Sequence, residues 1–228
     1  MIDITDASAR RRFYLSRSLR KHPIGAGSNL SALMALPRIP LPMNFAELFP
    51  NEPWCLIGGV ATRAYMPERT TRDIDILVAH PATIDKILRD NTWTYDQELF
   101  FPNTTLALCG TSYHKDHIVL DVFSSEQTWV AEALRTPTYD QTGVRVAPLA
   151  YLVLMKIDSA RGVDQGDLQR MLGRVNDSQL NDIVAIIEKY SHDPQAADDV
   201  RQYAQLGRWE RQQPQRNHDL DIDRGPTW

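Results

Sequence analysis

Two short stretches decide the fold: Gly58-Gly59-Val60-Ala61-Thr62 and, after a spacer, Asp73-Ile74-Asp75-Ile76-Leu77-Val78. The second stretch is apolar apart from its two aspartates and alternates with a period of two, which is typical of a strand. Asp73 and Asp75 then point to the same face, roughly 6.5–7 Å apart along the strand. Unpaired carboxylates are costly to bury, and a divalent cation between them removes that cost. Mg²⁺ suits such a site because it prefers oxygen ligands, and Mn²⁺ is the alternative ion.

The glycine pair is predicted to lie where a strand ends and a helix begins. Residues 54–57 form a short apolar run bounded by Pro53 and Gly58, which favours a buried strand, and a helix is expected over Val60 to Met66. Backbone N–H groups and the positive end of the helix dipole are exposed at such a junction, so a phosphate can approach closely. A phosphate cradle beside a metal-binding carboxylate pair indicates a nucleoside triphosphate site.

A third carboxylate interrupts the otherwise apolar run His117–Phe123. In that run Val119, Asp121 and Phe123 are expected to share one face, and a lone acid in a buried strand is unusual without a partner. If this strand lies beside 73–78, Asp121 completes a three-carboxylate site that can bind metal and orient and deprotonate a hydroxyl. The alternative is an aspartate that faces water on an edge strand.

These motifs resemble the nucleotidyltransferase superfamily that includes DNA polymerase beta, and within it the AbiEii-type abortive-infection and toxin–antitoxin group. The similarity spans roughly residues 52–190. It rests on Gly58-Gly59, Arg69-Thr70-Thr71-Arg72, Asp73-Ile74-Asp75, Asp121, Leu152-Val153-Leu154-Met155-Lys156-Ile157, Ala160-Arg161, Asp164 and Asp167-Leu168. Two features depart from the family pattern: Val163 stands where a polar residue is common, and Gly-Gly replaces the Gly-Ser of minimal nucleotidyltransferases.

The resemblance implies an α+β fold, with a nucleotidyltransferase-type mixed sheet flanked by helices and followed by a C-terminal helical bundle. It also implies a Mg²⁺-dependent transfer of a nucleoside monophosphate from an NTP such as ATP to a hydroxyl of tRNA or protein, as the toxin of a toxin–antitoxin pair with an antitoxin partner. The implied catalytic residues are Asp73, Asp75, Asp121 and Lys156, and the three aspartates are the implied metal ligands. The implied nucleotide-binding residues are Gly58, Gly59, Arg72, Lys156 and Arg161.

Composition changes along the chain suggest its organisation. A basic and proline-rich arm is expected over 1–45, the nucleotidyltransferase domain over 46–147, a helical domain over 148–210 and a polar tail over 211–228. Within the second segment, strands are expected around Trp93–Phe101, Thr104–Cys109 and His117–Phe123. In the third, Ser178 is expected to cap one helix, and Asp193-Pro194 to begin a last helix that ends near Leu206.

The whole-chain numbers exclude several classes of protein. Hydrophobic residues make up 43% and charged residues 24% of 228 residues, which is the balance of an ordinary globular protein. The net charge is −4, so contact with RNA would have to come from a local basic patch such as Arg10 to Lys21. Cys55 and Cys109 are expected to be reduced and buried. With neither a membrane span nor a signal peptide evident, a cytoplasmic location is expected.

Two other functions stay open at this point. One is a small-molecule nucleotidyltransferase of the aminoglycoside-modifying type, which needs an acidic pocket for a polycationic acceptor. Asp96, Glu98, Asp140 and Asp158 are the residues available for such a pocket. The other is a non-catalytic protein that keeps the fold and binds nucleotide without transferring it.

Overall fold

The computed structural model describes residues 43–66, 73–101, 104–140 and 142–212. The basic stretch Arg10 to Lys21, the segment Arg69 to Arg72 and most of the polar tail lie outside the described residues. The division of the chain into four segments therefore stays a prediction.

A mixed sheet forms the first half of the described chain. Its seven strands lie in the order β3-β4-β5-β2-β1-β7-β6. The pairs β2–β5 and β1–β7 are parallel, and the other neighbouring strands are antiparallel. The strands are β1 (Trp54–Ile57), β2 (Asp73–Val78), β3 (Thr94–Leu99), β4 (Cys109–Lys115), β5 (Ile118–Ser124), β6 (Thr138–Tyr139) and β7 (Arg145–Val146).

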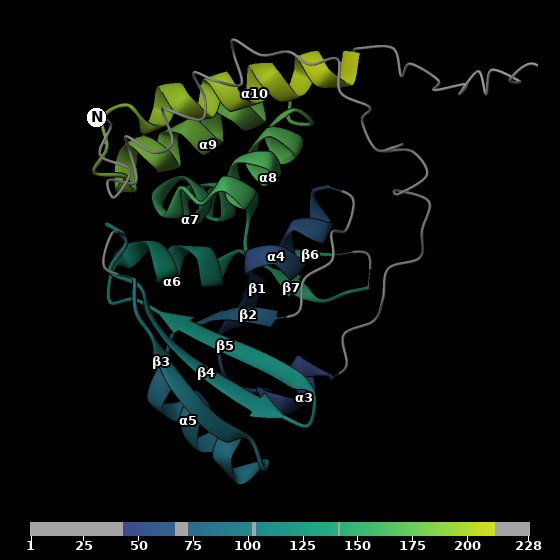
Figure 1. Ribbon diagram of the computed structural model, residues 1–228, viewed down its shortest axis with the longest axis vertical. Helices are drawn as coiled ribbons and strands as arrows, with labels where there is room; N and C mark the ends of the chain where they lie inside the picture. Colours follow the sequence, from purple (N-terminus) through teal and green to yellow (C-terminus); the bar gives the residue numbers. More distant parts are fainter. Residues whose placement is uncertain (1–42, 67–72, 102–103, 141, 213–228) are drawn as a thin grey trace, which may run out of the picture.

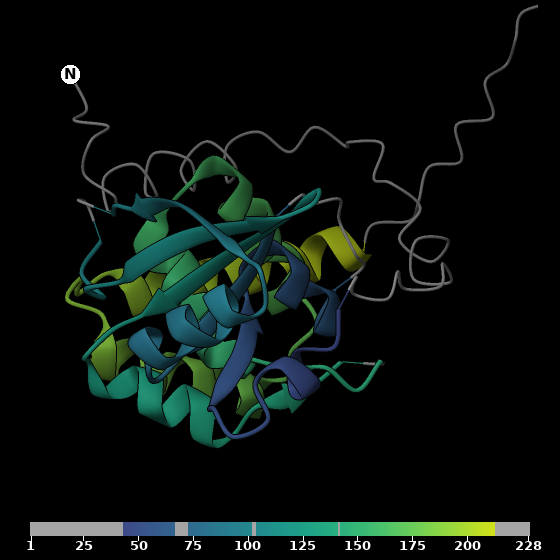
Figure 2. The same cartoon turned by 90° about the horizontal axis from the view of Figure 1, so that it is seen from below.

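Helices cover the sheet and then stack on one another. Figure 1 shows α7, α8, α9 and α10 packed together on one side of the molecule, whereas α5 lies on the opposite side of the sheet, as Figure 2 also shows. The described helices are α3 (Phe45–Leu48), α4 (Gly58–Ala61), the 3-10 helix η1 (Thr62–Ala64), α5 (Pro81–Asp90), α6 (Thr128–Arg135), α7 (Leu149–Ser159), α8 (Gly162–Leu172), α9 (Asp177–Tyr190) and α10 (Ala196–Gln212). The expected α+β architecture is confirmed.

Alternation along β2 separates an apolar face from an acidic one. Ile74 and Ile76 are buried, and this face turns toward α5, because Tyr113 on the same face donates a hydrogen bond of 2.7 Å to Asp85 of that helix. The aspartates of β2 therefore lie on the face turned toward the C-terminal helices. This arrangement brings the candidate site between the sheet and the helical half of the chain.

The strand expected at Thr104–Cys109 is wrong, since the strand begins only at Cys109. The backbone N–H groups of Thr105 and Leu106 donate to the carboxylate of Asp158 instead of to a neighbouring strand. Ala107 has a positive φ of 47°, which no extended strand adopts. Cys109, expected to be buried, is exposed at the start of β4, whereas Cys55 is buried as expected.

Two helix boundaries also differ from the prediction. Asn176, not Ser178, is the N-cap of α9, and it forms a capping box with Gln179 in which each side chain accepts from the other residue's backbone N–H. The last helix begins at Ala196 and continues to Gln212, well past Leu206. Among the described residues, none of the helices combines the length and apolar character that crossing a lipid bilayer requires.

Two glycines let α8 and α10 approach closely. A Cβ on Gly207 would collide with the carbonyl oxygen of Gln169, and a Cβ on Gly173 would lie 2.5 Å from the carbonyl carbon of Gly207. Both obstacles are backbone atoms, which cannot move aside as a flexible side chain can. The packing of the two helices therefore depends on the missing side chains.

We predict that Gly207→Ala destabilises the protein by about 1–3 kcal/mol, because the added methyl group overpacks this contact. Gly166→Ala is the matched control, since Gly166 lies inside α8 with open space around its Cα. Alanine there should stabilise the helix by roughly 0.5–1 kcal/mol. Urea unfolding of both variants measures the difference, and equal stability of the two would contradict the close approach of the helices.

Candidate functional site

Three carboxylates meet on the acidic face of the sheet. The parallel pairing of β2 with β5 places Asp75 directly opposite Asp121 and Asp73 opposite Val119. Because residues two apart on a strand share a face, all three carboxylates lie on the same side. β5 is flanked by β4 and β2, so Asp121 does not lie on an edge strand. The alternative of a water-facing edge aspartate is thus wrong, and the predicted juxtaposition of the three aspartates is observed.

The Gly58-Gly59 turn lies against the middle of this cluster. β1 pairs with β2 so that Ile57 is opposite Asp75, and the chain then turns into α4. Gly58 has a positive φ of 64°, and a Cβ there would collide with the Asp75 carboxylate. The backbone N–H of Gly59 donates a hydrogen bond to that carboxylate. Only glycine at position 58 lets the turn approach Asp75 so closely.

Burial and neighbouring negative charges raise the pKa of two of the carboxyl groups. Burial raises the pKa of Asp75 to about 7, and the neighbouring charges of Asp121 and Asp73 add to that shift. Burial also raises the pKa of Asp121, which Asp73 and Asp96 raise further, whereas a hydrogen bond from Ser112 opposes the shift. Both carboxylates thus lie where additional positive charge would be favourable.

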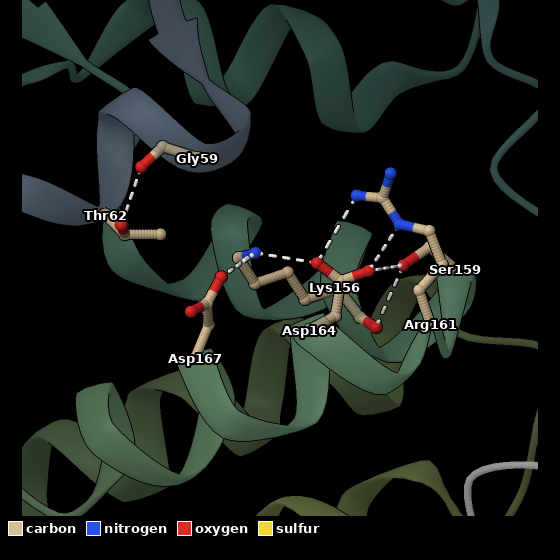
Figure 3. Close-up of polar contacts among 7 residues, drawn as sticks. All are labelled: Gly59, Thr62, Lys156, Ser159, Arg161, Asp164 and Asp167. Atoms are coloured by element: carbon tan, nitrogen blue, oxygen red, sulfur yellow. Dashed lines mark hydrogen bonds and ion pairs between the residues drawn. The ribbon is translucent and has the colours of Figure 1, made fainter. Parts of the chain in front are cut away.

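The helical half supplies a buried ion-pair network across α7 and α8. Lys156 is only 5% exposed, and its Nζ donates to Asp164 Oδ1 and to Asp167 Oδ2, each at 2.8 Å (Figure 3). The hydroxyl of Ser159 donates to Asp164 Oδ2 at 2.6 Å. These contacts hold the two helices at a fixed spacing, since a buried charge without a partner is strongly unfavourable.

Arg161 connects this network to the acidic face of the sheet. Its Nε donates to Asp164 Oδ2 at 2.7 Å, yet 66% of its side chain is exposed. The hydrogen bond to Asp164 raises the pKa of the Arg161 guanidinium, and the charge of Asp75 adds to this rise. In return, the charge of Arg161 opposes the rise in the pKa of Asp75. Figure 3 shows that the second terminal nitrogen of Arg161, which is free of drawn bonds, points away from Asp164.

The predicted site residues therefore fall into three groups. Asp73, Asp75, Asp121, Gly58 and Gly59 lie together, with Arg161 in electrostatic contact with them. In the structure, Lys156 is engaged by two carboxylates of the helical half, so its predicted contact with phosphates stays a prediction. Arg72 lies outside the described residues.

Sequence reasoning missed Ser112, whose hydroxyl donates to Asp121 Oδ1 at 2.6 Å. The signal that could have found it is the register of β4 against β5, which the misplaced strand concealed. Two of the four residues considered for an acidic pocket, Asp140 and Asp158, are engaged in contacts within the protein. Asp140 is buried in an ion pair with Arg63, and the carboxylate of Asp158 accepts hydrogen bonds from the backbone N–H of Thr105. The charge of Asp96 contributes to the raised pKa of Asp121.

The donors fit Mg²⁺ by their chemistry rather than by forming a closed cage. In the described part of the chain, no group of three or more His, Cys, Asp or Glu side chains is placed so that it could hold a metal ion by itself. Mg²⁺ commonly takes one or two carboxylates and completes its shell with water and substrate phosphates. Burial is the main cause of the raised pKa values of Asp75 and Asp121, and the like charges near each group add to it, so a bound cation would be favourable there.

No protein-family model and no curated protein matches the chain. Solved structures with similar folds include JHP933 from Helicobacter pylori, with 12% identity, a TM-score of 0.40 and coverage of 80% of this chain and 90% of that one. ANT(2″)-Ia in complex with adenylyl-2″-tobramycin has 15% identity, a TM-score of 0.37 and coverage of 73% and 92%. Terminal uridylyl transferase 4 from Trypanosoma brucei with bound dUTP has 11% identity, a TM-score of 0.29 and coverage of 89% and 71%.

The chain is thus distantly similar in structure to these three solved proteins. Similarity at this level assigns neither a reaction nor a residue role. The AbiEii-type relationship stays a prediction, and the proposals below rest on the geometry of this chain.

We predict that Lys156→Met destabilises the protein by about 3–5 kcal/mol, because it leaves Asp164 and Asp167 buried without their shared cation. Lys86→Met on the exposed side of α5 is the control and should change stability little. Urea unfolding checks both variants. A Lys156→Met protein as stable as the wild type would show that the network does not hold α7 and α8 together.

A second prediction concerns pH and Asp75. The pKa is about 7 in the folded protein and near 3.8 in the unfolded chain. The folded state therefore binds the proton more tightly, and stability falls as pH rises from about 4 through 7. Asp75→Asn removes this dependence, so at pH 8 in a chelator the variant should be more stable than the wild type by on the order of 2 kcal/mol.

Thermal unfolding between pH 4 and pH 8 measures this difference, which should shrink as the pH falls. Asp90→Asn is the control, because its carboxyl group is exposed at the end of α5. A stability gain for Asp75→Asn that does not change with pH would contradict the raised pKa.

Proposed function

We propose that the protein is a Mg²⁺-dependent nucleotidyltransferase that moves a nucleoside monophosphate from an NTP to a hydroxyl acceptor. The observation that carries this proposal is the register of β2 against β5, which places Asp73, Asp75 and Asp121 on one face. The Gly58-Gly59 turn beside them supports it, as does the exposed guanidinium of Arg161, whose charge acts on Asp75. Nucleotide transfer needs this combination, because positioning and charge neutralisation supply most of the catalysis.

Asp121 is the proposed base for the acceptor. Its carboxylate accepts the proton of the acceptor hydroxyl as the oxygen of that hydroxyl forms a bond to the α-phosphorus. The bond between the α-phosphorus and the oxygen that bridges to the β-phosphate breaks, and pyrophosphate leaves with the electron pair. Asp73 and Asp75, with Asp121, would hold Mg²⁺, whose charge offsets that of the phosphates.

Arg161 is the proposed contact for the triphosphate from the helical half. Asp164 binds one edge of its guanidinium, which fixes the side chain while leaving the other edge exposed. A guanidinium held in this way suits a phosphate, since its planar donors match two phosphate oxygens. Lys156 acts in this proposal as the buried cation that holds Asp164, and Gly58 and Gly59 lie beside the phosphates.

The finer proposal follows the resemblance in the sequence. It takes tRNA or a protein as the acceptor and assigns the enzyme the role of a toxin that an antitoxin partner controls. The aminoglycoside-type alternative is less well supported, because Asp140 and Asp158 are engaged in contacts within the protein. A protein that binds nucleotide without transferring it is distinguished by experiment.

The test uses the purified full-length chain with Mg²⁺ and each α-³²P-labelled NTP in turn. The acceptors are total tRNA, lysate proteins and a panel of aminoglycosides. We expect label in RNA or protein, and we expect Asp121→Asn to lower the transfer rate by about 10²–10⁴-fold because the acceptor loses its base. Label in the aminoglycosides alone would overturn the finer proposal, and binding of Mg²⁺–NTP without any transfer would favour the non-catalytic alternative.

Arg161 has its own prediction in the same assay. Arg161→Ala should raise the KM for the NTP by about 10-fold or more, because the triphosphate loses a charged hydrogen-bond donor. Arg201→Ala is the matched control, since Arg201 lies on α10 and pairs there with Asp198 and Glu188. A KM for Arg161→Ala equal to that of the control would remove Arg161 from the nucleotide site.

A further inference from the structure

Ser112 is a buried polar residue to which the proposed reaction assigns no role. It lies on β4, is 3% exposed and sits directly opposite Asp121 in the antiparallel pairing with β5. Its hydroxyl donates to Asp121 Oδ1 at 2.6 Å. This distance is in the short range that is typical of a hydroxyl bound to a carboxylate, where the bond is stronger than between neutral groups.

The position of Ser112 determines which oxygen of Asp121 is occupied. β4 and β2 lie on opposite sides of β5, so Asp121 has Ser112 on one flank and Asp75 on the other. Oδ1 is bound on the β4 side. Within the described residues, Oδ2 is therefore the oxygen that remains available on the side of Asp75. A ligand bound between β2 and β5 would meet this oxygen.

Without this bond, repulsion would govern the orientation of Asp121. The charges of Asp73 and Asp96 both act on its carboxyl group. A carboxylate rotates readily about its terminal torsion, for which the preferred angles are broad. The Ser112 hydroxyl lies on the side of β5 away from β2. It holds the Asp121 carboxylate in one orientation without adding a charge to the site.

We propose that Ser112 is a positioning residue for nucleotide transfer, which binds Oδ1 of Asp121 and so presents Oδ2 to the metal and the acceptor hydroxyl. This inference rests on the proposed function and adds a residue from a third strand to its machinery. Ser112 touches neither substrate nor metal, and it acts through Asp121 alone. The rate of the chemical step should therefore depend on it more than nucleotide binding does.

The test compares Ser112→Ala with Ser112→Thr, which keeps the hydroxyl, and with Thr111→Ala. Thr111 is the matched control because it is the preceding residue of β4, and its side chain lies on the opposite face. We expect Ser112→Ala to lower kcat by about 10–100-fold while the KM for the NTP changes less than about 3-fold. Ser112→Thr should restore most of the rate, and Thr111→Ala should behave as the wild type.

A readout separate from activity is the affinity for Mn²⁺ in the presence of ATP, followed by electron paramagnetic resonance. Ser112→Ala should weaken this affinity by about 10-fold, and it should have no further effect in an Asp121→Asn background. Full additivity of the two changes would overturn the proposal. So would a Ser112→Ala protein that matches Thr111→Ala in kcat and in Mn²⁺ affinity.

A purely structural role of Ser112 would give a different set of results. In that case Ser112→Ala lowers the melting temperature, and its kcat per folded molecule equals that of the wild type, which overturns the proposal. Failure of the proposed function looks different again, because the wild-type protein then transfers no nucleotide, whether or not it binds Mn²⁺. The Ser112 proposal falls with it in that case.

Discussion

The crowding of three carboxylates on one face of the sheet is the constraint around which the rest of the structure is arranged. Parallel pairing of β2 with β5 brings Asp75 opposite Asp121, and the period of two adds Asp73 to the same face. Like charges at this spacing repel one another, and burial strengthens the repulsion. Burial raises the pKa of Asp75 and of Asp121, and neighbouring negative charges raise it further. A cation bound between the strands would reverse this rise.

The helical half does not neutralise this face by itself. Lys156 and Arg161 carry two positive charges, and their partners Asp164 and Asp167 carry two negative charges, so the network is balanced internally. Only Arg161 extends from it toward Asp75. Within the described residues, this network therefore leaves the negative charge of the three aspartates unbalanced, and Arg161 is its exposed guanidinium. A metal–triphosphate complex suits this arrangement, because it has a cation for the aspartates and phosphate oxygens for the guanidinium.

The sequence was sufficient to predict the features that local pattern controls. Alternation in 73–78 predicted β2 and the shared face of its aspartates, and Gly58-Gly59 predicted a strand-to-helix turn. It could not predict contacts made between distant segments. The Asp158 carboxylate captures the backbone near Thr105, so the β4 strand starts later than its composition suggests. That shift concealed Ser112, and pairing across α7 and α8 buried Lys156.

The most direct test of the central claim is to locate the metal–nucleotide site by nuclear magnetic resonance. ¹⁵N-labelled protein would be titrated with Mn²⁺ and a non-hydrolysable NTP, because Mn²⁺ broadens the signals of nearby amides. The account predicts broadening centred on residues 58–60, 74–76 and 120–122, with Arg161 also affected. Broadening centred elsewhere, or none at saturating nucleotide, would contradict the claim that these strands form one metal–nucleotide site.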